Sequence, residues 1–477
     1  MMIKSKLFKF YIIFCFLNFV HSISIGQITF EKIYDFPWRF ISASSAIPIN
    51  SGYILVGSSI DTILRRSNNV IVRIDQYGDT LWSRGIKSYY YQMVISADSI
   101  INLVGNNNQG IISQYNLNGD SLRTVELYPY DTTVHSVFPI STHLFGICNS
   151  WDGGLIVTGY RDSSICCNLL FFAMKLDRFF NTVWVWNRDN EFTQTRNADL
   201  IETSDHSILI KYEESDGGFS NPVCGIVKLD GDGNLIWTKS GYNIHSYYSH
   251  DEASNHDYIH CGIRNDYFSS TFLSYVERMD TAGNIIWRDT SSKYTFRSLC
   301  STFENGIAMI GNNKDSLNNY HSFLRIYDNS GQLMTHRYFR DDITDKTFSI
   351  KETSDSGLII AGSAKDTSTS STNYNSYLIK TDKNGNLINS INNLGQNKIS
   401  ISPNPFSDRL FVSLDVNSKY ELKLYSTLGT LILKQNFQGN SIEFNLNNYS
   451  SGIYLMRIHD EKTKESFSTK LIKISEK

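Results

Sequence analysis

One segment of this chain gathers the residue types that carry metal or acid–base chemistry. Between positions 245 and 260 it holds four histidines and three acidic residues: His245, His250, His256, His260, Asp251, Glu252 and Asp257. Imidazole and carboxylate groups are common metal ligands and general acids or bases. The histidine spacings of five, six and four residues match no familiar metal motif. Two interpretations stay open, a metal or acid–base site and an ordinary polar surface loop, and the second is favoured.

A second feature recurs along the chain, namely an acidic or amide residue followed three places later by glycine. These turns begin at Asp75, Asn116, Asp177, Asp230, Asp280, Asp328 and Asp382, and Phe180 replaces the glycine of the third. Their oxygens suit calcium, but the residues after the most acidic turn, Leu235–Trp237, supply no further ligand. An aspartate that accepts backbone N–H groups and a glycine at positive φ explain every copy as a tight hairpin turn. We therefore expect no metal and no other cofactor.

A basic residue lies two places before the turn aspartate in five copies: Arg73, Lys175, Lys228, Arg278 and Lys380. Two places along a strand is the same face of a sheet. One interpretation is a ring of cations that lines a channel. The other, which we favour, is a local ion pair with a neighbouring aspartate or an adjacent repeat.

Six cysteines follow the N-terminal region: Cys148, Cys166, Cys167, Cys224, Cys261 and Cys300. An even number permits disulfides in an exported protein but leaves fifteen pairings open. Cys148 and Cys300 occupy equivalent places in two repeats, so we do not expect them to pair. No CxxC pair indicates a zinc site.

The turns belong to a repeat that fills residues 27–396. Each copy also contains a short apolar run, which ends in glycine in examples such as Tyr53–Gly57, Leu155–Gly159 and Ile307–Gly311. Seven copies of about four short strands, without a helical pattern, predict an all-β fold and specifically a seven-bladed β-propeller. Residues 28–34 resemble the strand that follows each turn, and we expect them to complete the last blade and close the ring. A β-helix or open solenoid is the alternative.

The composition is that of a globular chain, with 13% aromatic and 19% charged residues. The N-terminal and C-terminal regions are both net basic, which leaves the repeat region acidic. Because phosphate binding needs a basic face, we expect no nucleic-acid partner.

The first 26 residues have the layout of a secretory signal peptide. Lys4, Lys6 and Lys9 precede a short apolar run, Phe10–Val20, and small residues follow it. The run is too short for a stable membrane span. We expect cleavage near Gly26 and Gln27, and no transmembrane span in the mature chain.

The C-terminal region, residues 397–477, carries a set of short motifs: Ser402–Pro405, Leu422–Gly429, Leu446–Met456 and Lys470–Lys473. Their order and spacing resemble the type A C-terminal sorting domain of the bacterial type IX secretion system. The residues that carry the resemblance are Pro403, Asn404, Pro405, Gly429, Gly452, Tyr454, Lys470 and Lys473. Six or seven alternating strands in this region predict a small Ig-like antiparallel β-sandwich.

The resemblance implies recognition by the type IX secretion machinery and passage through the periplasm across the outer membrane of a Bacteroidetes-type bacterium. Release or anchoring at the cell surface would follow.

Two functional classes remain for the repeat region. In the first it is a non-catalytic module that binds an extracellular glycan or protein through loops on one face. In the second it is a hydrolase or lyase that acts on polysaccharide or peptide. We favour binding, because the repeated residues all have turn or packing explanations and no catalytic set is recognisable.

Overall fold

A computed structural model describes residues 27–474, apart from 35–38, 61–66, 87–88, 108, 128–140, 163–168, 189–193, 216–222, 242–243, 267–270, 316–318, 340–342, 367–373, 388–398, 403–405, 427–429 and 463–465. The chain forms two compact units, Met1–Leu387 and Ile388–Lys477. The predicted boundary between residues 396 and 397 lies outside the described residues. All regular elements of the described residues are strands, which confirms the predicted all-β class.

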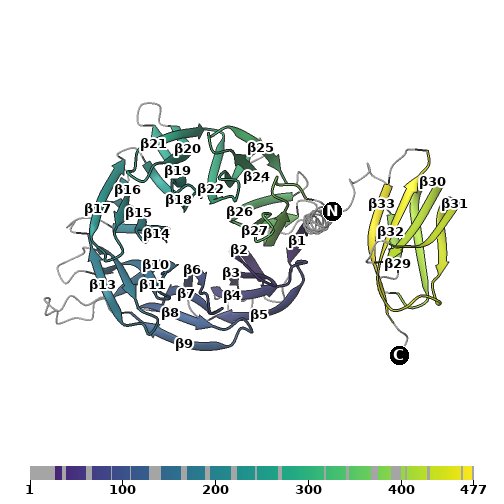
Figure 1. Ribbon diagram of the computed structural model, residues 1–477, viewed down its shortest axis with the longest axis horizontal. Coiled ribbons are helices and arrows are strands. Elements are labelled where there is room, and N and C mark those ends of the chain that lie inside the picture. The colour runs from purple at the N-terminus through teal and green to yellow at the C-terminus, as the bar shows by residue number, and fades with distance from the viewer. Residues whose placement is uncertain are drawn as a thin grey trace, which may run out of the picture. The chain divides into compact units, whose positions relative to one another are not determined.

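Seven four-stranded antiparallel sheets make up the described part of the first unit, and Figure 1 shows them around a propeller-like ring. Sheet 1 contains β2 (Arg39–Ile49), β3 (Gly52–Ile60), β4 (Ser67–Ile74) and β5 (Thr80–Ile86). Sheet 2 contains β6 (Tyr89–Ile95), β7 (Ile101–Asn106), β8 (Gly110–Tyr115) and β9 (Ser121–Glu126). Sheet 3 contains β10 (Thr142–Asn149), β11 (Leu155–Asp162), β12 (Leu169–Leu176) and β13 (Thr182–Asn187).

The next sheets repeat this plan. Sheet 4 contains β14 (Gln194–Glu202), β15 (Ile208–Ser215), β16 (Val223–Leu229) and β17 (Leu235–Gly241). Sheet 5 contains β18 (Ile244–Glu252), β19 (Tyr258–Asp266), β20 (Thr271–Met279) and β21 (Ile285–Ser291). Sheet 6 contains β22 (Tyr294–Ser301), β23 (Ile307–Lys314), β24 (Tyr320–Tyr327) and β25 (Leu333–Tyr338). Sheet 7 contains β26 (Ile343–Glu352), β27 (Leu358–Asp366), β28 (Asn375–Thr381) and, as its outer strand, β1 (Phe30–Tyr34).

The outer strand of sheet 7 comes from the N-terminal end of the described chain, as predicted for residues 28–34. Strand β1 pairs antiparallel with β28, from Phe30 opposite Lys380 to Tyr34 opposite Ser376. Strand β1 also contacts sheet 1, because the Tyr34 hydroxyl donates to the Gly78 carbonyl at 2.8 Å. One strand therefore joins the last sheet to the first.

The hydrophobic core of the ring is divided among the spaces between sheets. Seven clusters of buried apolar side chains each join two neighbouring sheets, in the order 1–2, 2–3, 3–4, 4–5, 5–6, 6–7 and 7–1. The cluster between sheets 7 and 1 includes Phe30, Leu55 and Leu378. Each sheet thus buries both faces against its neighbours.

The turns between the third and fourth strands have the predicted chemistry. In the first copy, Asp75 Oδ1 accepts the backbone N–H groups of Tyr77 and Asp79 at 2.9 and 2.8 Å. Gly78 lies at φ 82°, and the six turn glycines all have φ between 77° and 87°. Phe180, which replaces the glycine of the third copy, adopts φ 72°. Turn geometry therefore holds even where the side chain opposes it.

Tryptophans of the fourth strands link these turns around the ring. The indole Nε1 of Trp82, Trp184, Trp237 and Trp287 donates to a carbonyl in the corresponding turn of the next sheet, at 3.0–3.3 Å. At Gly233 the Trp184 ring packs so closely that a Cβ atom would lie 2.7 Å from Cδ2. We call this pairing the tryptophan–turn contact. In sheet 1 the equivalent glycine, Gly78, packs against Phe30 of β1.

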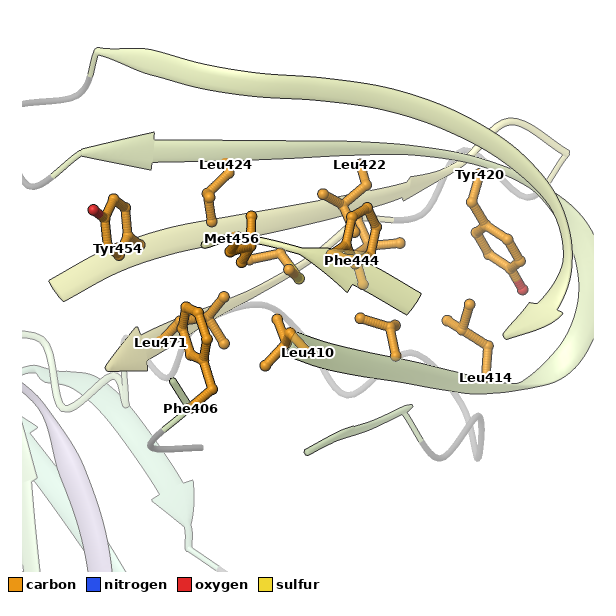
Figure 2. Close-up of a cluster of buried hydrophobic side chains, with 13 residues drawn as sticks. Phe406, Leu410, Leu414, Tyr420, Leu422, Leu424, Phe444, Tyr454, Met456 and Leu471 are labelled. Atoms are coloured by element: carbon orange, nitrogen blue, oxygen red, sulfur yellow. The ribbon is translucent and has the colours of Figure 1, made fainter. Parts of the chain in front are cut away.

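The second unit is a five-stranded antiparallel sheet of β29 (Ile399–Ser402), β30 (Arg409–Ser426), β31 (Leu431–Asn445), β32 (Gly452–Asp460) and β33 (Ser466–Lys473). The sequence predicts six or seven strands in this region, whereas the described residues form five. Strands β30 and β31 are long, and their pairing shifts register between Ser413 and Ser418. A core of thirteen buried residues, including Leu422, Phe444 and Met456, fills the space enclosed by the strands (Figure 2).

A pair of glycine substitutions tests the tryptophan–turn contact. Gly153 and Gly233 share φ values of 84° and 86°, but no atom lies within 4 Å of a Cβ placed at Gly153. We expect Gly153→Ala to cost about 1–2 kcal/mol for the left-handed backbone alone. Gly233→Ala should cost about 1–3 kcal/mol more, because Trp184 must move. Urea unfolding of both variants measures the difference, and equal losses would contradict the contact's importance.

Candidate functional site

The structure divides the histidine-rich segment between two environments. His250 on β18 and His260 on β19 are paired in register and buried. His256 lies in the exposed turn between these strands at φ 70°. The side chain of His245 lies outside the described residues. The described histidines therefore do not converge on one point, and the described residues contain no group of three or more metal-ligating side chains.

The acidic residues of the same segment connect neighbouring elements. Asp251 accepts the backbone N–H of Ser301 in sheet 6 at 2.9 Å. Glu252 accepts the N–H and hydroxyl of Ser204 in sheet 4, both at 2.7 Å. Glu202 and Glu352 bind turn N–H groups of their preceding sheets in the same way. Asp257 pairs with Arg278 at 2.7 Å. Asp251, Glu252, Glu202 and Glu352 thus connect neighbouring sheets, and Asp257 pairs within sheet 5.

A polar network joins the inner strands of the ring. Gln92 of β6 donates to Asp199 of β14 at 2.7 Å, and its Oε1 accepts the Ile147 N–H of the intervening β10 at 2.7 Å. Gly146 stands in β10 at the register position that Gln92 occupies in β6, directly after the strand's bulge. Because glycine has no side chain there, Gln92 can reach past sheet 3 to sheet 4.

The network continues on sheets 4 and 5. Lys211 Nζ lies 3.2 Å from Asp199 Oδ2, and His250 Nε2 lies 4.0 Å from the same oxygen. The side chains of Lys211 and His250 are almost fully buried, whereas 28% of the Asp199 side chain is exposed. Neither ring nitrogen of His250 has a hydrogen-bond partner among the described residues.

The electrostatics fix the charge states of this network. Burial favours the neutral form of Asp199, but Lys211 and His250 outweigh it and lower its pKa to about 2. Burial lowers the pKa of His250 to about 3 despite the attraction of Asp199. Near neutral pH, Asp199 is therefore ionised and His250 is neutral. An acceptor already neutralised by a lysine suits polar binding better than proton abstraction.

A second buried network crosses sheet 5. His260, Glu277 and Arg288 are register neighbours on β19, β20 and β21. Glu277 bonds His260 Nε2 through one oxygen and Arg288 Nε through the other. Burial opposes the charged carboxylate, but His260 and Arg288 outweigh it and lower the pKa of Glu277. This series of three side chains extends from the second strand of the sheet to its outer strand.

The five repeated basic residues form local contacts, as favoured from the sequence. Lys175, Lys228 and Lys380 pair with Asp152, Asp205 and Asp355 at 2.9, 3.0 and 3.1 Å. These partners lie in the turn between the first and second strands of the same sheet, not in the turn after the lysine. Arg73 donates to the Leu117 carbonyl of sheet 2 at 2.8 Å. Arg278 likewise pairs with Asp257. The five repeated basic residues therefore make local contacts and do not form a ring of cations along a channel.

The turns that supply these aspartates form a repeated motif that the sequence analysis did not single out. Their fourth residues are Ser99, Gly153, His206, His256, Asn305 and Ser356, all with φ between 61° and 84°. A serine or threonine three places before that residue in most copies was the available signal.

The cysteines Cys148, Cys261 and Cys300 are buried thiols without disulfides. Burial raises the pKa of each thiol, which disfavours the thiolate form. Cys224 is also buried, and Cys166 and Cys167 lie outside the described residues.

Of the two residues at the expected signal-cleavage site, Gly26 lies outside the described residues. Gln27 is described, and its side chain contacts both turns of sheet 7. Its Nε2 donates to the Asp355 carbonyl, and its Oε1 accepts the Lys383 N–H at 3.4 Å. Among the described residues no helix has the length and apolar character to cross a membrane.

The sorting-motif residues of the second unit come together on β32 and β33. Gly452 is opposite Lys473, and the buried Tyr454 is opposite Leu471. Pro403, Asn404, Pro405 and Gly429 lie outside the described residues. The segment directly after Pro405 is described: Phe406 N donates to Ile472 O at 2.9 Å, and Ile474 N donates to Phe406 O at 2.8 Å. The two ends of the unit therefore pair.

The two motif lysines have different surroundings. Lys473 is buried, donates to the Ser407 carbonyl and lies over the Phe406 ring at 5.6 Å. Lys470 is exposed on the opposite face of β33. Lys473 thus fastens the C-terminal strand to residues 406–408.

This contrast gives a testable pair of substitutions. Lys473→Ala should destabilise the second unit by about 2 kcal/mol, because it leaves the Ser407 carbonyl unpaired and uncovers Phe406. Lys470→Ala should change stability by less than about 0.5 kcal/mol. Chemical denaturation of the full chain, followed by a probe in the second unit, measures both. Equal effects would show that Lys473 has no structural role.

Residues 400–474 match the family of secretion system C-terminal sorting domains. An endo-acting ulvan lyase of Formosa agariphila is 32% identical over 75 residues, which cover 16% of this chain and only 14% of that protein.

Several solved structures resemble the chain at low sequence identity. The β-propeller domain of the trilobed protease of Pyrococcus furiosus is 13% identical, with a TM-score of 0.44 over 72% of this chain and 96% of that chain. Pyrococcus horikoshii acylaminoacyl peptidase is 14% identical, with a TM-score of 0.47 over 80% of this chain and 59% of that chain. A protein of unknown function from Bacteroides caccae is 9% identical, with a TM-score of 0.40 over 61% of this chain and 94% of that chain. The family match confirms the resemblance seen in the tail: residues 400–474 are a secretion system C-terminal sorting domain.

Proposed function

We propose that this protein is an exported binding protein of a Bacteroidetes-type bacterium. Residues 1–26 are its signal peptide, and the ring is a closed seven-bladed β-propeller that binds an extracellular glycan or protein without catalysis. The Ig-like C-terminal domain is recognised by the type IX machinery, which releases the protein or leaves it at the outer-membrane surface. The sorting-domain match at residues 400–474 supports the export route.

The single observation that carries the binding role is the difference between the two ends of the ring. Because neighbouring strands are antiparallel, the turns after the first and third strands of every sheet lie at one end. Every one of these turns that joins two strands of the ring contains five residues, except the first, at residues 50–51. At the other end of the ring, the stretch of sequence between the end of one strand and the start of the next ranges from two residues (87–88) to fifteen (127–141). We call this second end the variable end, and varied connections on a rigid scaffold are the usual location of binding residues.

The alternative, a hydrolase or lyase acting on polysaccharide or peptide, has one specific observation in its favour. Asp199 and His250 approach each other near the inner strands, where an ionised, partly exposed carboxylate lies beside a neutral imidazole near neutral pH. Lys211 already neutralises Asp199 at 3.2 Å, and the described residues near it include no activated nucleophile. We therefore place binding first.

Deletion of residues 398–477 tests the export route. In a bacterium with a type IX system, the truncated protein should accumulate in the periplasm, because the machinery has no domain to recognise. Fractionation and immunoblotting measure its location. As the control, residues 388–477 fused to an unrelated periplasmic protein should carry it outside the cell. Truncated protein in the medium would refute the sorting role.

A further inference from the structure

We propose that an aromatic surface on sheet 6, formed by Tyr294, His336 and Tyr338, binds the sugar rings of a glycan. This inference deepens the proposed binding role by naming the ligand class and the residues. Tyr294 is the first residue of β22 and Tyr338 is the last residue of β25. Both positions belong to the variable end of the ring.

The strand register places these side chains on one face of sheet 6. Tyr338 is opposite Phe323, and His336 is opposite Arg325, two places further along the same strand. Cross-strand partners and residues two apart share a face. Gly311, also opposite Phe323, has no side chain on this face, and a Cβ there would lie 2.6 Å from the Phe323 ring. The absent side chain gives the aromatic rings room to meet.

The rings form a continuous cluster. The Tyr294 centroid lies 4.9 Å from that of Phe323 and 5.3 Å from that of His336. His336 is stacked on Phe323 at 5.5 Å and lies 5.2 Å from Tyr338. The Tyr338 hydroxyl donates to the Tyr294 hydroxyl at 3.3 Å. Phe323 is fully buried, whereas His336 is exposed and 36% of Tyr338 is exposed. The cluster therefore has a buried base and a solvent-facing edge.

A buried arginine fixes the cluster from below. Arg325 Nε donates to His336 Nδ1 at 3.0 Å, and its Nη1 contacts Asp289 of sheet 5 at 3.2 Å. The guanidinium lies 4.6 Å from the Tyr294 ring centre. Burial and the charges of Arg325 and Lys293 lower the pKa of His336. Because Nδ1 accepts a hydrogen bond, the neutral ring carries its hydrogen on Nε2, which leaves a donor for a ligand.

The cluster departs from the repeat. The positions equivalent to His336 in sheets 1–5 are Ser83, Thr124, Val185, Thr238 and Arg288. Those equivalent to Tyr338 are Gly85, Glu126, Asn187, Ser240 and Thr290. Five sheets thus pack without an aromatic residue at either position. The ring does not need these side chains for folding, so their clustering at the variable end indicates a ligand.

The chemistry of the surface favours a sugar. Flat aromatic rings offer an apolar face for the C–H groups of a pyranose, and two hydroxyls and an imidazole N–H lie at their edge. Lys293 Nζ, 5.4 Å from the Tyr294 centroid, adds a positive charge beside them. Neutral and uronate sugars share the stacking chemistry, and the lysine favours the second.

The test uses the full chain in affinity gel electrophoresis with soluble polysaccharides, namely a neutral xylan and β-glucan and an acidic alginate and polygalacturonate. Tyr338→Ala should lower the affinity for polysaccharide, measured from the retardation, about tenfold, because a stacking contact contributes up to about 1.5 kcal/mol. Tyr338→Phe should keep most of the binding. Phe179→Ala is the matched control, since it removes a 65% exposed aromatic ring from a turn at the opposite end. Lys293→Ala should reduce retardation only in the gels that contain the acidic polysaccharides, alginate and polygalacturonate.

Each outcome decides one claim. Loss of retardation in Tyr338→Ala but not in Phe179→Ala supports the aromatic surface. Equal retardation of wild type and Tyr338→Ala overturns it but leaves a binding protein that uses other residues. If none of the four polysaccharides retards the protein, the glycan-binding proposal is overturned, and a protein is the ligand class that the binding role still allows. Release of reducing ends from any polysaccharide would instead contradict the non-catalytic role.

Discussion

The ring depends on a contact that each sheet makes with the next one through its outer turn. A glycine at positive φ leaves the turn without a side chain, and in several sheets the preceding tryptophan packs on that space and donates its indole N–H to the turn. Each such hydrogen bond contributes only about 1 kcal/mol, but it fixes the angle between two sheets. Sheet 1 receives the equivalent contact from Phe30 and Tyr34 of β1. Closure of the ring thus depends on residues at opposite ends of the first unit.

This dependence explains why so many charged groups are buried. Each apolar cluster lies between two sheets, so no sheet has a core of its own, and losing one neighbour would expose a whole face. At the ends of the sheets, lysines pair with turn aspartates of their own sheet, and glutamates bind the N–H groups of a turn in the preceding sheet. These pairs remove the cost of burying polar ends between sheets. The end of the ring that carries the five-residue turns is therefore occupied by structural contacts.

Features that depend on residues close together in the sequence could be predicted, whereas contacts between distant residues could not. The turns at Asp75 and its equivalents, and the role of residues 28–34, depend on short patterns and were predicted. The partner of Lys175 was not, because Asp152 belongs to a different turn of the same sheet. The contact of Gln92 with Asp199 spans 107 residues and bridges non-neighbouring sheets, and no spacing rule predicts it. The cluster at Tyr338 joins residues from three strands of one sheet. In the tail, the described residues form five strands rather than the predicted six or seven, because the pairing of β30 with β31 continues across a register shift.

Closure of the ring by β1 is tested most directly by the stability of a chain that begins at residue 35 and so lacks this strand. Its thermal unfolding should be compared with that of a chain that begins at Gln27, with and without a synthetic peptide of residues 27–34. We expect a clearly lower melting temperature without β1, because the edge of β28 and the cluster between sheets 7 and 1 are uncovered. The peptide should restore most of the loss by pairing with β28. An unchanged melting temperature without β1 would contradict closure of the ring by this strand.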